Sequence, residues 1–332
     1  MTARRYIDAI TTALADALES DPAVVVLGED VTYGGPFGAT KGLVDRFGEH
    51  RVRDTPISEA TIMGMAVGAA ATGLRPVVEV MFADFVTLAM DQLINHAAKL
   101  HYMTGGLLRI PLTIRVQGGV GGLMGAHHSQ SLEAWFTHVP GLKVVAPAFP
   151  DDAESLLRSA IDDDNPVVYL EHRGLYWNRS RETAGSPSGA IVRRPGTDVT
   201  LASYSKMVHS ALEAAARLEA RGVSAEVVDL RWLAPLDLGA LVASTAKTGR
   251  LVVAHEAVRT GGVGAEIAAE VHAQAWGGLR APIERVAAPF APVGAARALE
   301  DAYTPGPESI VEAAMRTIEP NIPQPRRRPD AP

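Results

Sequence analysis

The chain has 332 residues, of which 47% are hydrophobic and 21% charged, the balance of a well-packed soluble protein with two domains of ordinary size. Its net charge of −7, without a recurring basic patch, argues against nucleic acid as a partner. The absence of cysteine excludes disulfides and thiolate metal sites. Because no apolar signal core or membrane-length apolar run is present, we expect a cytoplasmic protein that does not cross a membrane.

The first half alternates short β-branched runs with helical stretches. An amphipathic pattern places Tyr6, Ile10, Leu14 and Leu18 on one face of an N-terminal helix. We expect strands at 24–28, 76–82, 112–116, 142–148 and 167–171. We expect helices near 59–73, 86–103, 129–137 and 151–163. Near-continuous apolar strands that alternate with helices indicate a parallel sheet covered on both faces.

A polar, aperiodic segment rich in Gly, Pro, Ser and Arg, residues 178–197, predicts a linker between two domains. A second alternation follows it. The expected strands are 199–204, 225–230, 250–256 and 283–289, and the expected helices are 206–221, 237–247, 263–275 and 307–317. We therefore predict an α/β fold of two doubly wound, mostly parallel sheet domains, at 1–177 and 198–318. Residues 319–332 form a Pro- and Arg-rich tail, whose cluster Arg326–Arg328 is typical of a solvated end.

Glu59 is the only charged residue in the stretch 55–74, where it opens a helix of small and apolar residues that looks fully buried. One interpretation is capping, because Pro56 and Ser58 resemble a helix start and an acidic side chain suits the helix dipole. The Gly and Ala content weakens that interpretation, since it allows another backbone to approach closely. A buried carboxylate is costly unless it is paired. The alternative is a buried Glu59 that faces a ligand nitrogen.

A glycine-rich segment follows the predicted strand 112–116, with five glycines between residues 117 and 125. It ends in His127 and His128. A flexible surface loop is one interpretation. The other is a ligand site, because α/β proteins place ligands after the carboxyl ends of parallel strands. The adjacent histidines are a weak zinc signal, because neighbouring side chains on extended backbone point apart and no acidic residue stands at metal spacing.

Phe85 and a second glycine-rich segment give weaker signals. Phe85 is expected to follow a strand, so it is either a core ring or a platform for a heteroaromatic ligand. The sequence GGVGAEI at 261–267 matches a dinucleotide fingerprint only in part, since Ile267 replaces the third glycine, and a tight strand-to-helix turn is favoured. The chain has no GxxxxGK[ST] and no GxSxG, which excludes P-loop and α/β-hydrolase sites.

Six segments in order resemble the β subunit of thiamine-diphosphate-dependent 2-oxoacid dehydrogenases: DTPISE, GLRPVVEVMFADF, AMDQLINHAAKLHYMTGG, HHSQSLEAWF, PGLKVVAP and DDDNPVVYLEH. The resemblance covers nearly the whole chain. It implies a transketolase-like pyrimidine-binding domain followed by a transketolase C-terminal-like domain. It also implies oxidative decarboxylation of a 2-oxo acid with acyl transfer to lipoamide. ATIM and VMFADF favour the pyruvate and acetoin branches, with pyruvate first; acetoin and branched-chain substrates are the alternatives.

The resemblance also implies site residues. The glutamate matching Glu59 bonds the aminopyrimidine ring nitrogen of thiamine diphosphate and so promotes proton abstraction from the cofactor. Phe85 packs on the pyrimidine face with Ile57 beside it. His128 faces the substrate and assists acyl transfer, although His127 stands where the family usually has Gln. A structural potassium ion is implied on the backbone carbonyls of Ile110, Ala160, Ile161, Asp163 and Asn165.

Half of the expected site is missing, because this chain has no GDG motif, which in the family holds the diphosphate through magnesium. The resemblance therefore implies an α subunit that carries the motif, two copies of each subunit, and a dihydrolipoyl acyltransferase core on which the second domain docks. Two other interpretations stay open. One is an enzyme of the same architecture with another substrate, and the other is a non-catalytic scaffold, which the presence of Glu59, Phe85 and His128 disfavours.

Overall fold

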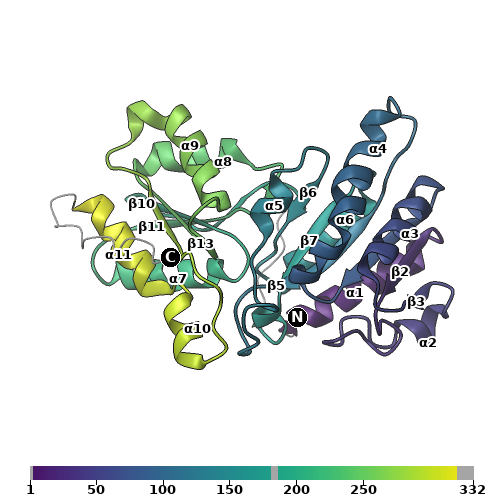
Figure 1. The fold of residues 1–332 in the computed structure, drawn as a ribbon. Helices are drawn as coiled ribbons and strands as arrows, with labels where there is room; N and C mark the ends of the chain where they lie inside the picture. The colour runs from purple at the N-terminus through teal and green to yellow at the C-terminus, as the bar shows by residue number, and fades with distance from the viewer. Residues whose placement is uncertain (1–2, 181–185, 320–332) are drawn as a thin grey trace. The chain divides into compact units, whose positions relative to one another are not determined.

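A computed structural model describes residues 3–180 and 186–319 (Figure 1). Most of the predicted tail and the linker residues 181–185 lie outside this part of the chain. The fold divides into two compact units. The first comprises the residues up to 118 together with 135–187, and the second comprises 119–134 together with the residues from 188 onward. The glycine-rich segment, expected in the first domain, therefore groups with the second unit.

The first unit is built on a parallel sheet. Its strands are β2 (Val24–Gly28), β3 (Val52–Asp54), β4 (Arg75–Val80), β5 (Thr113–Gly118), β6 (Lys143–Val145) and β7 (Val167–His172). Neighbouring strands follow the order β6-β7-β5-β4-β2-β3, and all of these pairs are parallel. Apart from β3, in which Arg53 and Asp54 are exposed, the strands are mostly buried, as their apolar sequences require. A short antiparallel pair joins β1 (Arg4–Arg5) to β8 (Arg179–Ser180).

Two groups of helices cover this sheet. In one group, α1 (Tyr6–Ser20) packs against α6 (Pro150–Asp162). In the other, α3 (Glu59–Ala71) packs against the 3₁₀ helix η1 (Ala83–Ala89) and the π-helix η2 (Gln92–Ala97) (Figure 1). Shorter helices complete the unit: α2 (Leu43–Phe47), α4 (Ala98–Met103), η3 (Arg173–Leu175) and α5 (Glu133–Thr137), which begins in the second unit.

The second unit has a smaller sheet in the order β14-β13-β10-β11-β9. Its strands are β9 (Ile191–Arg194), β10 (Val199–Ser203), β11 (Ala225–Asp229), β13 (Leu251–Val258) and β14 (Glu284–Ala288). All pairs are parallel except that of β9 with β11. The remaining elements are α7 (Met207–Glu219), β12 (Trp232–Ala234), α8 (Leu238–Thr248), α9 (Val263–Ala275), η4 (Trp276–Gly278), α10 (Arg297–Tyr303) and α11 (Pro307–Ile318). The predicted fold class is confirmed.

Two predicted helices differ from those observed. The single helix expected at 86–103 is a succession of η1, η2 and α4. The buried residues follow this change, since Val86 and Ala89 are three apart while Leu93 and Ala97 are four apart. The helix expected at 129–137 is only α5. Its predicted first turn does not form, because the carbonyl of Gln130 instead accepts a hydrogen bond from the amide of Gly119.

The predicted linker is not free of regular structure. Residues Arg179–Ser180 form β8, and Ile191–Arg194 form the antiparallel strand β9. The strand β9 pairs with β11, and a buried ion pair accompanies this pairing, in which Arg193 Nη2 lies 2.9 Å from the Asp229 carboxylate of β11. The short elements α2 and β3 were also missed, because each is too brief to show a hydrophobic period. Within the described ranges, no helix is long and apolar enough to cross a membrane.

The expectation that the helix after Glu59 is fully buried is wrong within this chain. Its inner face is buried, but Thr61, Met65, Gly68 and Thr72 are exposed along its outer face. This spacing of four, three and four residues describes one stripe of a helix. A Cβ built on Gly68 would meet no atom within 4 Å. The small residues therefore present an open surface.

Candidate active site

Glu59 is the first residue of α3, and its side chain is only 7% exposed. Ser58 precedes it, but the Ser58 hydroxyl donates to Thr61 Oγ1 at 2.8 Å and caps no backbone amide. The Glu59 carboxylate has neither a hydrogen bond nor an ion pair with any residue in the described ranges. A buried carboxylate in this state lacks the partner that its burial calls for. The capping interpretation thus has no hydrogen bond to support it.

A second buried carboxylate, Glu29, lies near Glu59 and was not singled out from the sequence. It directly follows β2 and is 8% exposed. Burial raises the pKa of Glu29, and the nearby charges of Glu59 and Asp30 raise it further. The signal that could have identified it is an acidic residue immediately after a buried strand, at the edge where α/β proteins bind ligands. Two carboxylates at this edge can accept hydrogen bonds from a donor that the described residues themselves do not supply.

The two apolar residues expected beside the cofactor lie in the same unit as Glu59. Ile57, two residues before Glu59, is 82% exposed. Phe85 lies in η1 and is half-buried, with its ring edge-on to that of Phe82 at a centroid distance of 5.4 Å. A single exposed apolar side chain is common on protein surfaces, so the exposure of Ile57 does not by itself indicate a site.

His128 lies in the glycine-rich loop, which we define as residues 119–130 and which belongs to the second unit. His127 is exposed, His128 is half-buried, and the adjacent Ser129 is buried. Glu59, Ile57 and Phe85 thus belong to one unit and His128 to the other. Among the described residues, no three His, Asp or Glu side chains gather closely enough to hold a metal ion.

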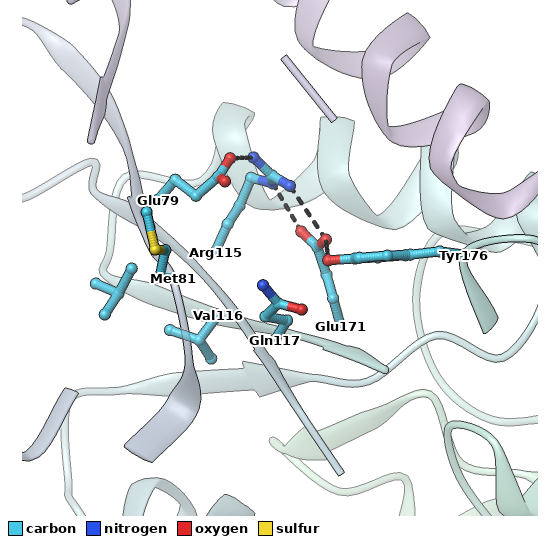
Figure 2. A pocket seen from close by; sticks show the side chains of 8 residues that line it. Glu79, Met81, Arg115, Val116, Gln117, Glu171 and Tyr176 are labelled. Atoms are coloured by element: carbon cyan, nitrogen blue, oxygen red, sulfur yellow. Dashed lines mark hydrogen bonds and ion pairs between the residues drawn. The ribbon is translucent and has the colours of Figure 1, made fainter. Parts of the chain in front are cut away.

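A buried ion network crosses the centre of the first sheet (Figure 2). Arg115 of β5 donates through Nη1 to Glu79 Oε2 at 2.5 Å and through Nε to Glu171 Oε1 at 2.7 Å. The Tyr176 hydroxyl donates to the other Glu171 oxygen at 2.7 Å. Burial raises the pKa of Glu79, and Arg115 opposes that rise. Gln117 lines the adjoining cavity of about 10 Å³, and its side-chain oxygen has no partner among the described residues. That volume fits one water molecule.

The segment expected to hold potassium spans the last turn of α6 and the residues directly after it, with Ile110 from the segment before β5. Two of its carbonyl oxygens, those of Ile161 and Asp163, accept hydrogen bonds of 3.2 Å from Arg75 Nη1. Lys143 forms an ion pair with the Asp163 carboxylate, which also accepts from Asn165. Carbonyl oxygens are hard ligands with two lone pairs each, so their chemistry fits a monovalent cation beside the guanidinium. Arg75 also forms an ion pair with Asp164, so both cationic side chains at this turn have partners within the chain.

Comparison with known proteins agrees with this architecture. Residues 3–178 match the family profile "Transketolase, pyrimidine binding domain", and residues 188–310 match "Transketolase, C-terminal domain". Among solved structures, a split-gene transketolase described as an inactive β4 tetramer superposes with a TM-score of 0.77 and 25% identity, over 96% of this chain and 98% of that one. The fold is therefore of the transketolase type.

Curated relatives narrow the class. The β subunit of acetoin:2,6-dichlorophenolindophenol oxidoreductase from Cupriavidus necator is 44% identical over 94% of this chain and 96% of its own length. The β-2 subunit of the mitochondrial pyruvate dehydrogenase E1 component from Oryza sativa is 44% identical over 95% of this chain and 86% of its own length. The β subunit of 2-oxoisovalerate dehydrogenase from Bacillus subtilis is 43% identical over 96% of this chain and 99% of its own length. The chain belongs to this family, the E1 β subunits of thiamine-diphosphate-dependent 2-oxoacid dehydrogenases.

Proposed function

We propose that this chain completes a thiamine diphosphate site shared with an α subunit, and that Glu59 is its catalytic carboxylate. The observation that carries the proposal is the partnerless, buried state of Glu59 beside a second acid, Glu29. A protonated ring nitrogen of an aminopyrimidine is the kind of donor that such a carboxylate lacks. In a low-dielectric site that hydrogen bond is strong. Glu59 would hold the proton at this nitrogen and so set the tautomer of the ring.

The other residues of the site would orient the cofactor and the substrate and enclose them. Phe85 offers a half-buried aromatic face for a pyrimidine ring, and Ile57 offers an exposed apolar side chain beside it. When bound, thiamine diphosphate supplies the carbanion chemistry that decarboxylation of a 2-oxo acid requires. His128, half-buried on its loop, would hold or deliver a proton during acyl transfer to lipoamide.

The proposal includes an α subunit that holds the diphosphate and magnesium, in an assembly of two α and two β chains. Three features support it. The chain lacks a GDG motif. The outer face of α3 is open, as its exposed Thr61, Met65 and Gly68 show. Tyr102 and Leu107, near the end of α4, are 87% and 86% exposed. Exposed apolar and aromatic side chains such as Met65, Tyr102 and Leu107 are typical of subunit interfaces. We also propose that the assembly binds a dihydrolipoyl acyltransferase core through the second unit.

A structural potassium ion is part of the proposal. The backbone carbonyls that would hold it are those of Ile110, Ala160, Ile161, Asp163 and Asn165. Because Arg75 already bridges two of them, the ion would reinforce a turn that the guanidinium has ordered. The melting temperature in potassium chloride should then be higher than in sodium chloride of equal concentration, since an ion that binds only the folded state stabilises it. Equal melting temperatures would mean that Arg75 orders the turn without a bound potassium ion.

Pyruvate is the substrate we propose, with acetoin and branched-chain 2-oxo acids as alternatives. Relatives named for all three substrates are 43–44% identical to this chain, so overall identity favours none of them. The deciding experiment co-expresses the chain with its α partner and measures reduction of 2,6-dichlorophenolindophenol with pyruvate, acetoin and 2-oxoisovalerate. The highest kcat/KM assigns the substrate. No reduction with any of them, despite a purified α/β complex, would contradict the proposed reaction.

A further inference from the structure

The glycine-rich loop is closed on itself. At its base, the amide of Gly119 donates to the carbonyl of Gln130 at 3.3 Å. Between these ends the backbone is left-handed at several positions, including the non-glycine Leu123, whose φ is 58°. A non-glycine residue keeps such a conformation only when its surroundings hold it there. The loop that bears His128 therefore depends on contacts outside itself.

Those contacts come from the carboxyl edge of the second sheet. Glu256, near the end of β13, is 5% exposed and accepts a hydrogen bond from the amide of Val120. Lys206, just after the neighbouring strand β10, places Nζ 3.5 Å from Glu256 Oε2 and 3.4 Å from the carbonyl oxygen of Val120. Val120 is thus held through its donor by Glu256 and through its acceptor by Lys206. This arrangement fixes the orientation of the first peptide units of the loop.

Two more contacts hold the rest of the loop. The amide of Leu123 donates to Glu300 Oε1 of α10 at 3.2 Å. After the loop, the buried Tyr204 hydroxyl donates to Glu133 Oε1 at 2.7 Å. Burial raises the pKa of Glu133, and the negative charge of Glu256 raises it further. The two carboxylates are therefore close enough to influence each other's charge. All of these partners belong to the second unit, which holds the chain on both sides of His128.

We propose that Glu256, supported by Lys206, is a positioning residue for His128. This inference rests on the proposed function, because it assumes that His128 serves acyl transfer. Glu256 does not touch the reacting atoms. It anchors Val120, and Val120 adjoins the cross-loop bond between Gly119 and Gln130, two residues beyond His128. The second unit thereby sets where the imidazole stands, in addition to any role in docking.

The test uses the α/β complex with Glu256→Ala. We expect transfer to lipoamide to fall by about 10- to 100-fold, the range that displacement of a catalytic group produces. Reduction of 2,6-dichlorophenolindophenol, which needs no lipoamide, should be unchanged. Hydrogen exchange of a peptide spanning residues 119–130 should become faster. Glu256→Gln should restore most of the transfer, because its amide oxygen can still accept from Val120.

The matched control is Glu284→Ala, which removes another buried carboxylate of the second unit, one that pairs with Arg316 at 3.1 Å and does not touch the loop. It should leave exchange in residues 119–130 and lipoamide transfer unchanged. If Glu256→Ala fails to fold, Lys206→Met tests the same anchor and should give the same selective loss. Normal transfer in a folded Glu256→Ala complex overturns the inference, whether or not exchange is faster. Failure of the proposed function would appear differently, as no dye reduction by the wild-type complex.

Discussion

Glu29 and Glu59 form a pair of buried carboxylates at the carboxyl edge of the first sheet, and the charge of Glu59 helps to raise the pKa of Glu29. Neither side chain has a hydrogen bond or an ion pair to a residue within 3–180 or 186–319. Two buried carboxylates that have no hydrogen-bond donor within the described residues favour the binding of a ligand that supplies one. The aminopyrimidine ring of thiamine diphosphate is such a ligand.

Replacing Glu59 with Gln should remove catalysis without unfolding the protein. The amide keeps the shape of the side chain and forfeits no partner within the chain, so thermal melts should match the wild type. Substrate-dependent dye reduction by the α/β complex should fall by about 10²- to 10⁴-fold, the range for loss of an acid–base group. Glu284→Gln, which neutralises a buried carboxylate elsewhere, is the control. Near-normal turnover by Glu59→Gln would refute the assigned role.

Replacing His128 with Ala should impair acyl transfer to lipoamide more than decarboxylation. The comparison is between lipoamide-dependent turnover and dye reduction on the same preparation, since only the former includes acyl transfer. His127→Ala is the neighbouring control, because that exposed ring has no assigned role. If both rates of His128→Ala fall together, His128 serves the earlier step.

Replacing Arg115 with Met should cost about 3–5 kcal/mol of unfolding free energy, because it leaves the carboxylates of Glu79 and Glu171 buried without their cation. Urea unfolding of the isolated chain measures this loss. Arg109→Met is the control, since Arg109 forms an exposed ion pair with Asp164 and should contribute about 0–1 kcal/mol. A loss for Arg115→Met no larger than that of the control would show that the network is not stabilising.

His255 should make the second unit sensitive to acid. Burial lowers its pKa to about 4, and its Nδ1 lies 3.1 Å from the carbonyl of Ala257, which can only accept. The unfolded chain binds a proton below pH 6.5, so the stability from the neutral ring is complete above that pH. It is lost as pH falls toward 4, by about 3 kcal/mol.

The measurement compares the unfolding free energies of wild type and His255→Asn between pH 7 and pH 4. The difference isolates His255 from Asp229, whose pKa is raised by burial to about 6 and which acts in the opposite direction. The advantage of the wild type should shrink by about 3 kcal/mol across this range. An advantage independent of pH would contradict the account.

Much of the fold could be predicted because its elements satisfy local and global demands together. The strand at residues 24–28 was predicted to the residue, since VVVLG is apolar throughout and bounded by polar turns. The strand β9 could not be predicted in the same way. Its four residues lack a buried face, and the ion pair between Arg193 and Asp229 that accompanies its pairing with β11 joins residues distant in sequence.

The residues of the candidate site also differ in whether local sequence pattern or tertiary contacts reveal them. Glu59, Phe85 and His128 stand out because each follows an expected strand or opens an expected helix, whereas Ile57 is indicated only by the resemblance to the family. Glu29 and Glu256 did not stand out, although each lies at or near the end of a strand. Their importance comes from tertiary neighbours: Glu29 from the charge of Glu59, and Glu256 from the amide of Val120. Neither neighbour can be read from sequence spacing.

We propose that this chain holds half of a thiamine diphosphate site. Calorimetric titration with thiamine diphosphate and magnesium tests it most directly, first with this chain alone and then with the chain co-expressed with its α partner. We expect tight binding only by the α/β complex, and weaker binding by the complex with Glu59→Gln. Tight binding by the isolated chain would contradict the claim, because the site for the diphosphate would then lie within this chain.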